Sequence, residues 1–170
     1  MSTDVKLYVA RHGIGTGNEP DAPLSSDGFN QAEQLAGFLS QMEDLHVDRL
    51  ISSPYTRAWQ TAEIIEERLK IKLGPPGNRL REQGVRGVIE EESDEMVIAR
   101  VTSLTEELLK SDQHTFLLVT HRLILTLLLH HYASDFVLEE ITNPDLYLLT
   151  FRDGKCQVKR LWNTMQPVVV

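Results

Sequence analysis

Two arginines and two histidines occupy positions that suit chemistry on a phosphate group. Arg11 and His12 come directly after one apolar segment of the chain. Arg57 comes shortly after a second such segment, and His121 directly after a third. A guanidinium group can pair two phosphate oxygens at once, and an unprotonated imidazole nitrogen can act as a covalent nucleophile. If the fold brings these four side chains together, they form a local positive pocket for a tetrahedral dianion.

Strand and helix patterns alternate along the chain. Short apolar runs predict strands at 5–10, 49–52 and 116–120, and allow a further short strand at 71–73. Apolar residues at helical spacing predict helices at about 25–39, 53–69, 93–108 and 122–133. Two closing runs, 146–151 and 157–162, flank Asp153-Gly154 and predict a hairpin. The expected fold class is α/β, a three-layer α/β/α arrangement with a mostly parallel central sheet and a C-terminal antiparallel hairpin.

The carboxyl ends of the parallel strands are expected to gather the reactive side chains. In open α/β sheets, ligands bind just outside these ends. Arg11, His12 and His121 would all lie there. Ser53-Pro54 suits the start of the second helix, with serine as the cap and proline at the first helical position. That helix start would add backbone N–H donors for a phosphate.

Composition limits the other classes of function. The 170 residues are 41% hydrophobic and predict a single domain over 1–170. A formal charge of −8 disfavours nucleic-acid partners, and the longest apolar run, 123–129, is far too short to cross a membrane. The amino terminus lacks the pattern of a secretory signal, and Cys156 is the sole cysteine of the sequence. We therefore expect a cytoplasmic protein with no metal site, no nucleic-acid partner and no membrane partner.

The glycines after the first strand raise the alternative of a dinucleotide site. That fingerprint needs three glycines at a strand-to-helix turn. Here Gly13 and Gly15 are followed by Asn18 where the third glycine belongs, and Pro20 and Pro23 delay the next helix. The sequence therefore disfavours dinucleotide binding, and the glycines are expected to let a ligand approach the backbone closely.

Five segments resemble, in order and spacing, the motifs of the histidine phosphatase superfamily, which has the phosphoglycerate mutase-like fold. The segments are Arg11-His12-Gly13 with Asn18, Leu24-Ser25-x-x-Gly28-x-x-Gln31-Ala32, Ser52-Ser53-Pro54-x-x-Arg57-Ala58-x-Gln60-Thr61-Ala62, Leu80-x-Glu82, and Leu118-Val119-Thr120-His121. The resemblance extends from about Leu7 to Phe151, nearly the whole chain. It points to the small phosphatase branch of the superfamily.

The resemblance implies a role for each of the converging residues. His12 would be the nucleophile that takes the phosphoryl group and forms a phosphohistidine, which water then hydrolyses. Arg11, Arg57 and His121 would hold the phosphate oxygens and stabilise the transferring group, so that His121 also acts in catalysis. Asn18 would donate a further hydrogen bond to the phosphate.

A leaving alkoxide needs a proton, so a carboxylic acid should lie beside the pocket. The family pattern points to Glu82, in the loop after the second helix. Glu90 is the rival, because Gly87-Val-Ile-Glu90 distantly resembles a downstream family segment. We prefer Glu82. The wider acidic stretch 90–95 is expected to be a solvated helix start, with an acidic lip that disfavours highly anionic substrates as the alternative.

The chain departs from the family pattern at three positions. Gly15 stands where serine or threonine is common, and it removes a possible hydroxyl contact to phosphate. Ile14 stands where many members have glutamate. Arg122 replaces the glycine that usually follows the second histidine. Arg122 would either contact a second anionic group of the substrate at the pocket rim or be a surface arginine at a helix start.

The resulting functional hypothesis is a metal-independent phosphatase that hydrolyses phosphomonoesters and needs no cofactor. Short connections and the lack of an obvious insertion favour a phosphatase over phosphoglycerate mutase-type transfer. A protein phosphohistidine phosphatase is a further alternative, and a phospho-ligand-binding protein is the non-enzymatic one. The partner would be a small phosphorylated metabolite or a phosphohistidine protein. The sequence leaves the leaving group and the oligomeric state open.

Overall fold

The computed structural model describes residues 4–85 and 90–164. The elements follow one another in the order β1 (Val5–Arg11), α1 (Ser26–Ser40), β2 (Arg49–Ser52), α2 (Thr56–Leu69), the 3-10 helix η1 (Asn78–Leu80), α3 (Asp94–Lys110), β3 (Thr115–Thr120), α4 (Arg122–Tyr132), β4 (Asp145–Arg152) and β5 (Lys155–Asn163). The expected alternation of strands and helices is confirmed.

The five strands form one mixed sheet with the order β2-β3-β1-β4-β5. β3 pairs in parallel with both β1 and β2, whereas β4 and β5 are antiparallel and form the C-terminal hairpin. The register sets Arg11 of β1 opposite Thr120 of β3. The residues that follow each strand, His12 and His121, therefore lie at the same edge of the sheet.

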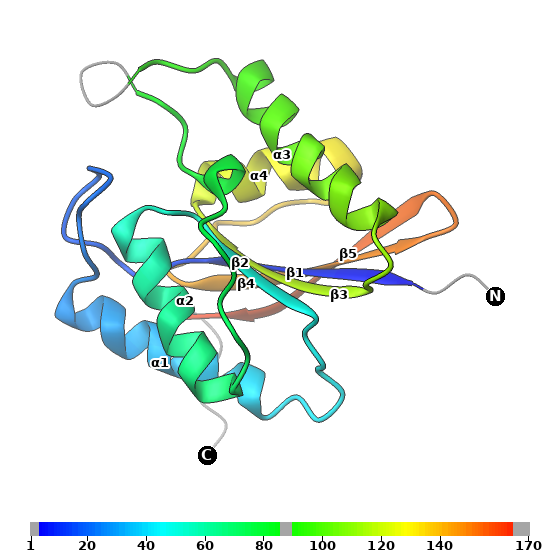
Figure 1. Ribbon diagram of the computed structural model, residues 1–170. Coiled ribbons are helices and arrows are strands. Elements are labelled where there is room, and N and C mark those ends of the chain that lie inside the picture. The colour runs from blue at the N-terminus through cyan, green and yellow to red at the C-terminus, as the bar shows by residue number, and fades with distance from the viewer. Residues whose placement is uncertain (1–3, 86–89, 165–170) are drawn as a thin grey trace.

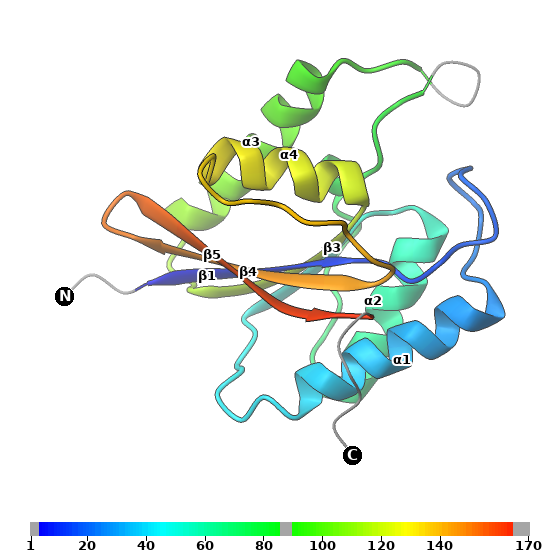
Figure 2. The same ribbon diagram turned by 180° about the vertical axis from the view of Figure 1, so that it is seen from behind.

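Two pairs of helices cover the two faces of the sheet (Figure 1), and the view from behind shows the same three layers (Figure 2). Alternate residues of β1 and β3 supply the two cores. Leu7 and Phe116 pack with the core on the side of α3 and α4, whereas Tyr8 and Leu117 pack with the core on the side of α1 and α2. Each fully buried large side chain stabilises the fold by about 1.5–3 kcal/mol. Because helices cover both faces of the sheet, the side chains on both faces of β3 are apolar.

The helix starts agree with the sequence for α1, α3 and α4 and differ for α2. Ser25 caps α1 by accepting a hydrogen bond from the Gly28 amide, and Ser93 caps α3 in the same way. The predicted start of α2 at Ser53-Pro54 is wrong, because the helix begins at Thr56 and its cap residue Tyr55 makes no side-chain capping bond.

The chain after α2 contains less strand than the sequence allowed. Residues 71–73 contribute a single parallel bridge between Leu73 and Leu50 in place of a strand. Along 4–85 and 90–164, no helix combines the length and the apolar character needed to cross a membrane.

Candidate active site

His12 lies directly after β1, with its ring almost fully buried. Its backbone amide donates to the carbonyl of Thr120, which ties the ends of β1 and β3 together. Its Nδ1 lies 2.5 Å from the carbonyl oxygen of Gly13. A carbonyl can only accept, so Nδ1 carries the hydrogen and Nε2 keeps its lone pair.

The surroundings of His12 keep its imidazole neutral. Burial lowers the pKa of His12 to about 3, and the nearby guanidinium groups of Arg57 and Arg11 act in the same direction. The bond to Gly13 opposes this shift without cancelling it. A neutral ring with a free Nε2 is the state that nucleophilic attack requires.

His121 follows β3 and lies beside His12, with 4.9 Å between the two ring centroids. Its Nε2 lies 2.8 Å from the hydroxyl oxygen of Ser53, which itself accepts a hydrogen bond from the amide of Tyr55. The Ser53 hydroxyl hydrogen is free to be donated to Nε2, and in that arrangement the ring hydrogen of neutral His121 lies on Nδ1. Burial is the main reason why the pKa of His121 lies well below its ordinary value.

Glu82 approaches His121 from the loop after η1. Its Oε2 lies 3.9 Å from Nδ1 of His121, which is beyond hydrogen-bonding distance. The buried Nδ1 has no hydrogen-bond partner within the described part of the chain. Because Glu82 lies beyond hydrogen-bonding distance, burial dominates at His121 and the imidazole is neutral.

Arg57, in the first turn of α2, is held from two sides. Its Nη1 donates to the carbonyl of Glu19 at 2.9 Å, and its guanidinium lies 5.4 Å from the ring centroid of Tyr55. A Cβ atom on residue 15 would lie 2.6 Å from Cδ of Arg57. Glycine at position 15, where the family commonly has serine or threonine, therefore leaves space for the aliphatic part of the Arg57 side chain.

Arg11, the last residue of β1, points its Nη1 to the carbonyls of Ile141 and Thr142, at 3.1 and 3.3 Å. Its Nε is buried and lacks a hydrogen-bond partner among residues 4–85 and 90–164. Burial, followed by repulsion from Arg122, lowers the pKa of Arg11 to about 10. The side chain is therefore still cationic at neutral pH.

A cavity of about 310 Å³ is lined by two of these residues, Arg57 and Glu82. Its lining residues are Asn18, Tyr55, Arg57, Glu82, Gln83, Val85, Arg122 and Leu123. The structure thus brings Asn18, Arg57, Glu82 and Arg122 to one pocket. Glu90 instead lines a neighbouring cavity with Arg81 and Met96, and residues 87–89 of its motif lie outside the described residues.

The backbone around the site makes close contacts within the protein. A Cβ on Gly13 would lie 2.5 Å from the carbonyl oxygen of Gly28, so this glycine lets the loop pack on the first turn of α1. Two N–H groups at the start of α2 are already engaged, because Tyr55 donates to Ser53 and Thr56 donates to the carbonyl of Pro20.

Two residues that contact the histidines were not predicted from the sequence. Ser53 was expected as a helix cap, and its hydroxyl instead bonds His121. Asn143 lies 131 positions after His12 and donates its side-chain amide to the His12 carbonyl at 3.1 Å. The motif around Ser53 marked its neighbourhood, whereas no sequence signal marked Asn143.

The acidic stretch before α3 is not uniformly solvated, contrary to expectation. Glu90 and Glu91 are exposed, but the side chain of Glu92 is only 9% exposed and pairs with Arg100 and Arg81. The hydrogen bond from Arg100 is the main reason why the pKa of Glu92 is lowered. Within 4–85 and 90–164, no three His, Cys, Asp or Glu side chains are grouped as a metal site.

The chain matches a known protein family over most of its length. The profile of the histidine phosphatase superfamily (branch 1) matches residues 7–88 and 76–164. An uncharacterised protein from Picosynechococcus sp. strain PCC 7002 is 36% identical over 76 residues. This match covers 42% of the chain and 44% of that relative, so the chain spans less than half of the relative's length.

Solved structures share the whole fold at low identity. A phosphoglycerate mutase from Bacillus anthracis superposes with a TM-score of 0.79 at 22% identity, over 94% of this chain and 93% of that chain. A mycobacterial glucosyl-3-phosphoglycerate phosphatase gives 0.75 at 21% identity, over 95% and 99%. The protein histidine phosphatase SixA, complexed with tungstate, gives 0.67 at 19% identity, over 93% and 95%. The phosphoglycerate mutase-like fold is therefore confirmed.

Proposed function

Because the chain belongs to the histidine phosphatase superfamily, we propose that it hydrolyses phosphomonoesters through a phosphohistidine formed on His12. Membership by itself supports a phosphatase or mutase-type activity. The observation that carries the finer proposal is the neutral, buried His12, whose Nδ1 is occupied by the Gly13 carbonyl. Only Nε2 has a lone pair for attack on phosphorus.

In the first step, Nε2 of His12 attacks phosphorus. A nitrogen–phosphorus bond forms while the bond from phosphorus to the ester oxygen breaks. Arg11 and Arg57 stabilise the negative charge on the non-bridging oxygens, and Asn18 donates a further hydrogen bond. Protonated Glu82 gives its proton to the leaving oxygen, so the alcohol departs neutral and Glu82 becomes a carboxylate.

In the second step, water reverses these changes. The Glu82 carboxylate takes a proton from water as the water oxygen attacks phosphorus. An oxygen–phosphorus bond forms, the nitrogen–phosphorus bond breaks, and His12 regains its lone pair. Inorganic phosphate leaves and Glu82 is again protonated, so the cycle closes without a cofactor.

The site's unpartnered donors explain why a dianion would bind here. The buried Nε of Arg11 and Nδ1 of His121 have no hydrogen-bond partners in the described chain. Such orphaned groups cost about 1–3 kcal/mol each, which an accepting phosphate oxygen would recover. A bound dianion would also raise the pKa of His121, because opposite charge favours the protonated ring. His121 would then add positive charge as the phosphoryl group transfers.

Arg122 supports a small phosphorylated metabolite as the substrate. It lies at the start of α4, is exposed, and shares the cavity with Leu123 and Val85. In this proposal its guanidinium contacts a second anionic group of the substrate, while the apolar neighbours contact the carbon skeleton. An unchanged kcat/KM of Arg122→Ala on phosphoesters with and without a second anionic group would contradict this role.

The test of the proposed function is hydrolysis of p-nitrophenyl phosphate with and without EDTA, by the wild type and His12→Ala. Turnover that EDTA leaves intact and that His12→Ala abolishes is the expected result. Equal turnover by His12→Ala would refute the histidine mechanism. Vanadate binding without turnover would favour a phosphohistidine-specific enzyme or a phospho-ligand binder, and phosphoryl exchange between two alcohols would favour a mutase.

A further inference from the structure

The proposed acid, Glu82, lies on a segment without regular secondary structure. Residues 81–85 follow η1 and belong to no helix or strand. A proton donor must nevertheless be held within hydrogen-bonding reach of the leaving oxygen, because a misplacement of about 1 Å can cost about 100-fold in rate. The contacts that fix this segment therefore matter for the chemistry.

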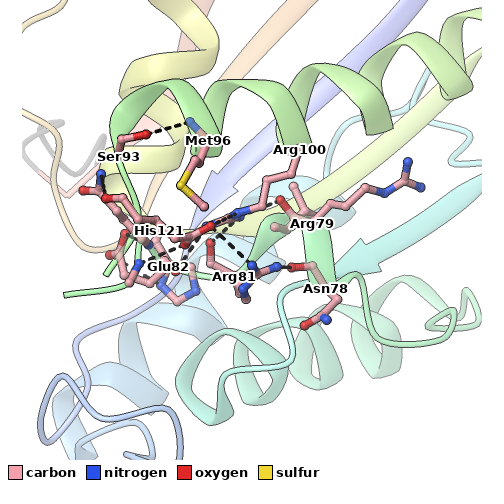
Figure 3. A network of polar contacts seen from close by, with 12 residues as sticks. Asn78, Arg79, Arg81, Glu82, Ser93, Met96, Arg100 and His121 are labelled. Atoms are coloured by element: carbon pink, nitrogen blue, oxygen red, sulfur yellow. Dashed lines mark hydrogen bonds and ion pairs between the residues drawn. The ribbon is translucent and has the colours of Figure 1, made fainter. Parts of the chain in front are cut away.

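Arg100 of α3 binds three backbone carbonyls of this segment. Its Nη1 donates to the carbonyls of Arg79 and Arg81, both at 2.8 Å, and its Nη2 donates to the carbonyl of Glu82 at 3.2 Å. Figure 3 shows the side chain reaching from the helix to the loop that carries Glu82, next to His121. One guanidinium group thus spans the turn that leads into the acid.

Glu92 completes the arrangement from the other side. Its Oε2 accepts from Nε of Arg100 at 3.0 Å, and its Oε1 accepts from Nη2 at 2.9 Å. Oε1 also accepts the amide of Gly84 at 2.9 Å, while the Glu92 carbonyl accepts from the side chain of Gln83 at 3.0 Å. The residues on both sides of Glu82 are therefore tied to the same pair.

This pair lies against the buried core of the fold. The side chains of Arg100 and Glu92 are only 10% and 9% exposed. The neighbours of Arg100 on α3, Val97 and Val101, lie in the core. The segment that carries Glu82 is also fixed to the sheet. The hydroxyl of Thr120, at the end of β3 and next to His121, donates to the carbonyl of Leu80 at 2.7 Å.

Resting on the proposed function, we propose that Arg100 and Glu92 are positioning residues that hold the Glu82 carboxyl group where it can protonate the leaving oxygen. Among the residues that line the cavity, their hydrogen bonds reach only the backbone of Glu82 and the side chain of Gln83. Substitutions of Arg100 or Glu92 should therefore slow esters whose leaving group needs a proton more than esters whose leaving group does not. Binding of the phosphoryl group should not depend on them.

The test compares two esters that differ in that need. p-Nitrophenolate is a stable anion and leaves without a proton, whereas the alkoxide of glycerol 2-phosphate requires one. The variants are Arg100→Lys, Glu92→Gln and, as the reference for loss of the acid, Glu82→Gln. Glu107→Gln is the matched control, because Glu107 also lies on α3 and pairs with Arg79 at 3.1 Å, but at the exposed surface.

We expect Glu82→Gln to lower kcat/KM, which reports the first step up to departure of the alcohol, by about 100-fold or more on glycerol 2-phosphate, with a much smaller loss on p-nitrophenyl phosphate. Arg100→Lys and Glu92→Gln should lower kcat/KM on the alkyl ester by roughly 10-fold and on the aryl ester by less than about 2-fold. Glu107→Gln should match the wild type on both. Combining Arg100→Lys with Glu82→Gln should add little to the loss from Glu82→Gln alone.

Several outcomes would overturn the inference, and they differ from failure of the proposed function. Equal losses on both esters, or no loss on either, would refute positioning if Glu82→Gln shows the selective loss. No selective loss in Glu82→Gln, or full activity of His12→Ala, would refute the proposed mechanism itself. Removing one partner leaves a buried charge unpaired, so Arg100→Met with Glu92→Met provides a variant without that penalty. It should show the same selectivity.

Discussion

Two buried neutral histidines should make the fold sensitive to acid, and His12 offers a way to measure the effect. In the folded protein, burial lowers the pKa of His12 to about 3, and the pKa of His121 lies well below its ordinary value. In the unfolded chain each imidazole titrates near its usual pKa of about 6.5. Below this pH the unfolded state binds protons that the folded state does not, so stability falls as the pH falls.

The size of the effect follows from the unfolded pKa. At pH 5, protonation of one unfolded histidine lowers the free energy of unfolding by about 2 kcal/mol, and at pH 8 by almost nothing. For His12 the cost between pH 8 and pH 5 is therefore about 2 kcal/mol, and the lowered pKa of His121 acts in the same direction. For His12 this loss should continue toward its folded pKa of about 3. A domain has about 5–15 kcal/mol in total, so the change is large.

The substitution His12→Asn isolates the contribution of one ring. Asparagine can place its amide nitrogen near the position of Nδ1 and keep a donor for the Gly13 carbonyl. Urea unfolding of both proteins at pH 8, 7, 6 and 5 gives the free energies. The loss between pH 8 and pH 5 should be about 2 kcal/mol smaller in the variant. Titrating groups away from His12 contribute equally to both proteins, whereas the pKa of His121 is lowered in part by His12 and changes with it. Parallel curves would refute a neutral His12.

Three further perturbations test separate contacts of the site. Arg57→Ala should weaken vanadate binding by about 10- to 100-fold in calorimetry, since a charged hydrogen bond contributes about 1.5–3 kcal/mol; unchanged affinity would exclude Arg57 from the phosphate site. Ser53→Ala leaves Nε2 of His121 without its hydroxyl partner and should cost about 1–3 kcal/mol in urea unfolding, with a smaller loss for Ser53→Thr. Gly13→Ala places a Cβ 2.5 Å from a backbone oxygen and should cost about 1–3 kcal/mol, whereas Gly37→Ala in α1, with 3.6 Å to its nearest atom, should be neutral or stabilising.

Local patterns predicted the scaffold because they reflect burial along single elements. The run 116–120 is apolar on both faces, and β3 is buried on both faces. The positions of Arg11, His12 and His121 followed from a general rule about the ends of parallel strands, and the register of β1 and β3 brings them together. Their roles in catalysis remain predictions.

Contacts between distant segments were beyond the reach of those patterns. The acidic run 90–95 reads as a solvated helix start, since charges near the amino end of a helix are favourable by themselves. Glu92 differs from its neighbours because its carboxylate accepts hydrogen bonds from Arg100, on α3, and from Gly84, in the loop after η1. Likewise, α2 was expected to begin earlier because Ser53 is a suitable cap residue. In the structure the Ser53 hydroxyl instead bonds Nε2 of His121.

Burial sorts the converging side chains into two kinds of group. Desolvation disfavours the charged form of every cation in the site. It lowers the pKa of Arg11 only to about 10, so this guanidinium stays positive at neutral pH. The same effect lowers the pKa of His12 to about 3, so this imidazole is neutral under the same conditions. One dry environment thus supplies a cationic binder for phosphate and a neutral nucleophile beside it, although the protein carries a net charge of −8. A more solvated pocket would keep the arginines positive, but it would leave part of His12 protonated and unable to attack.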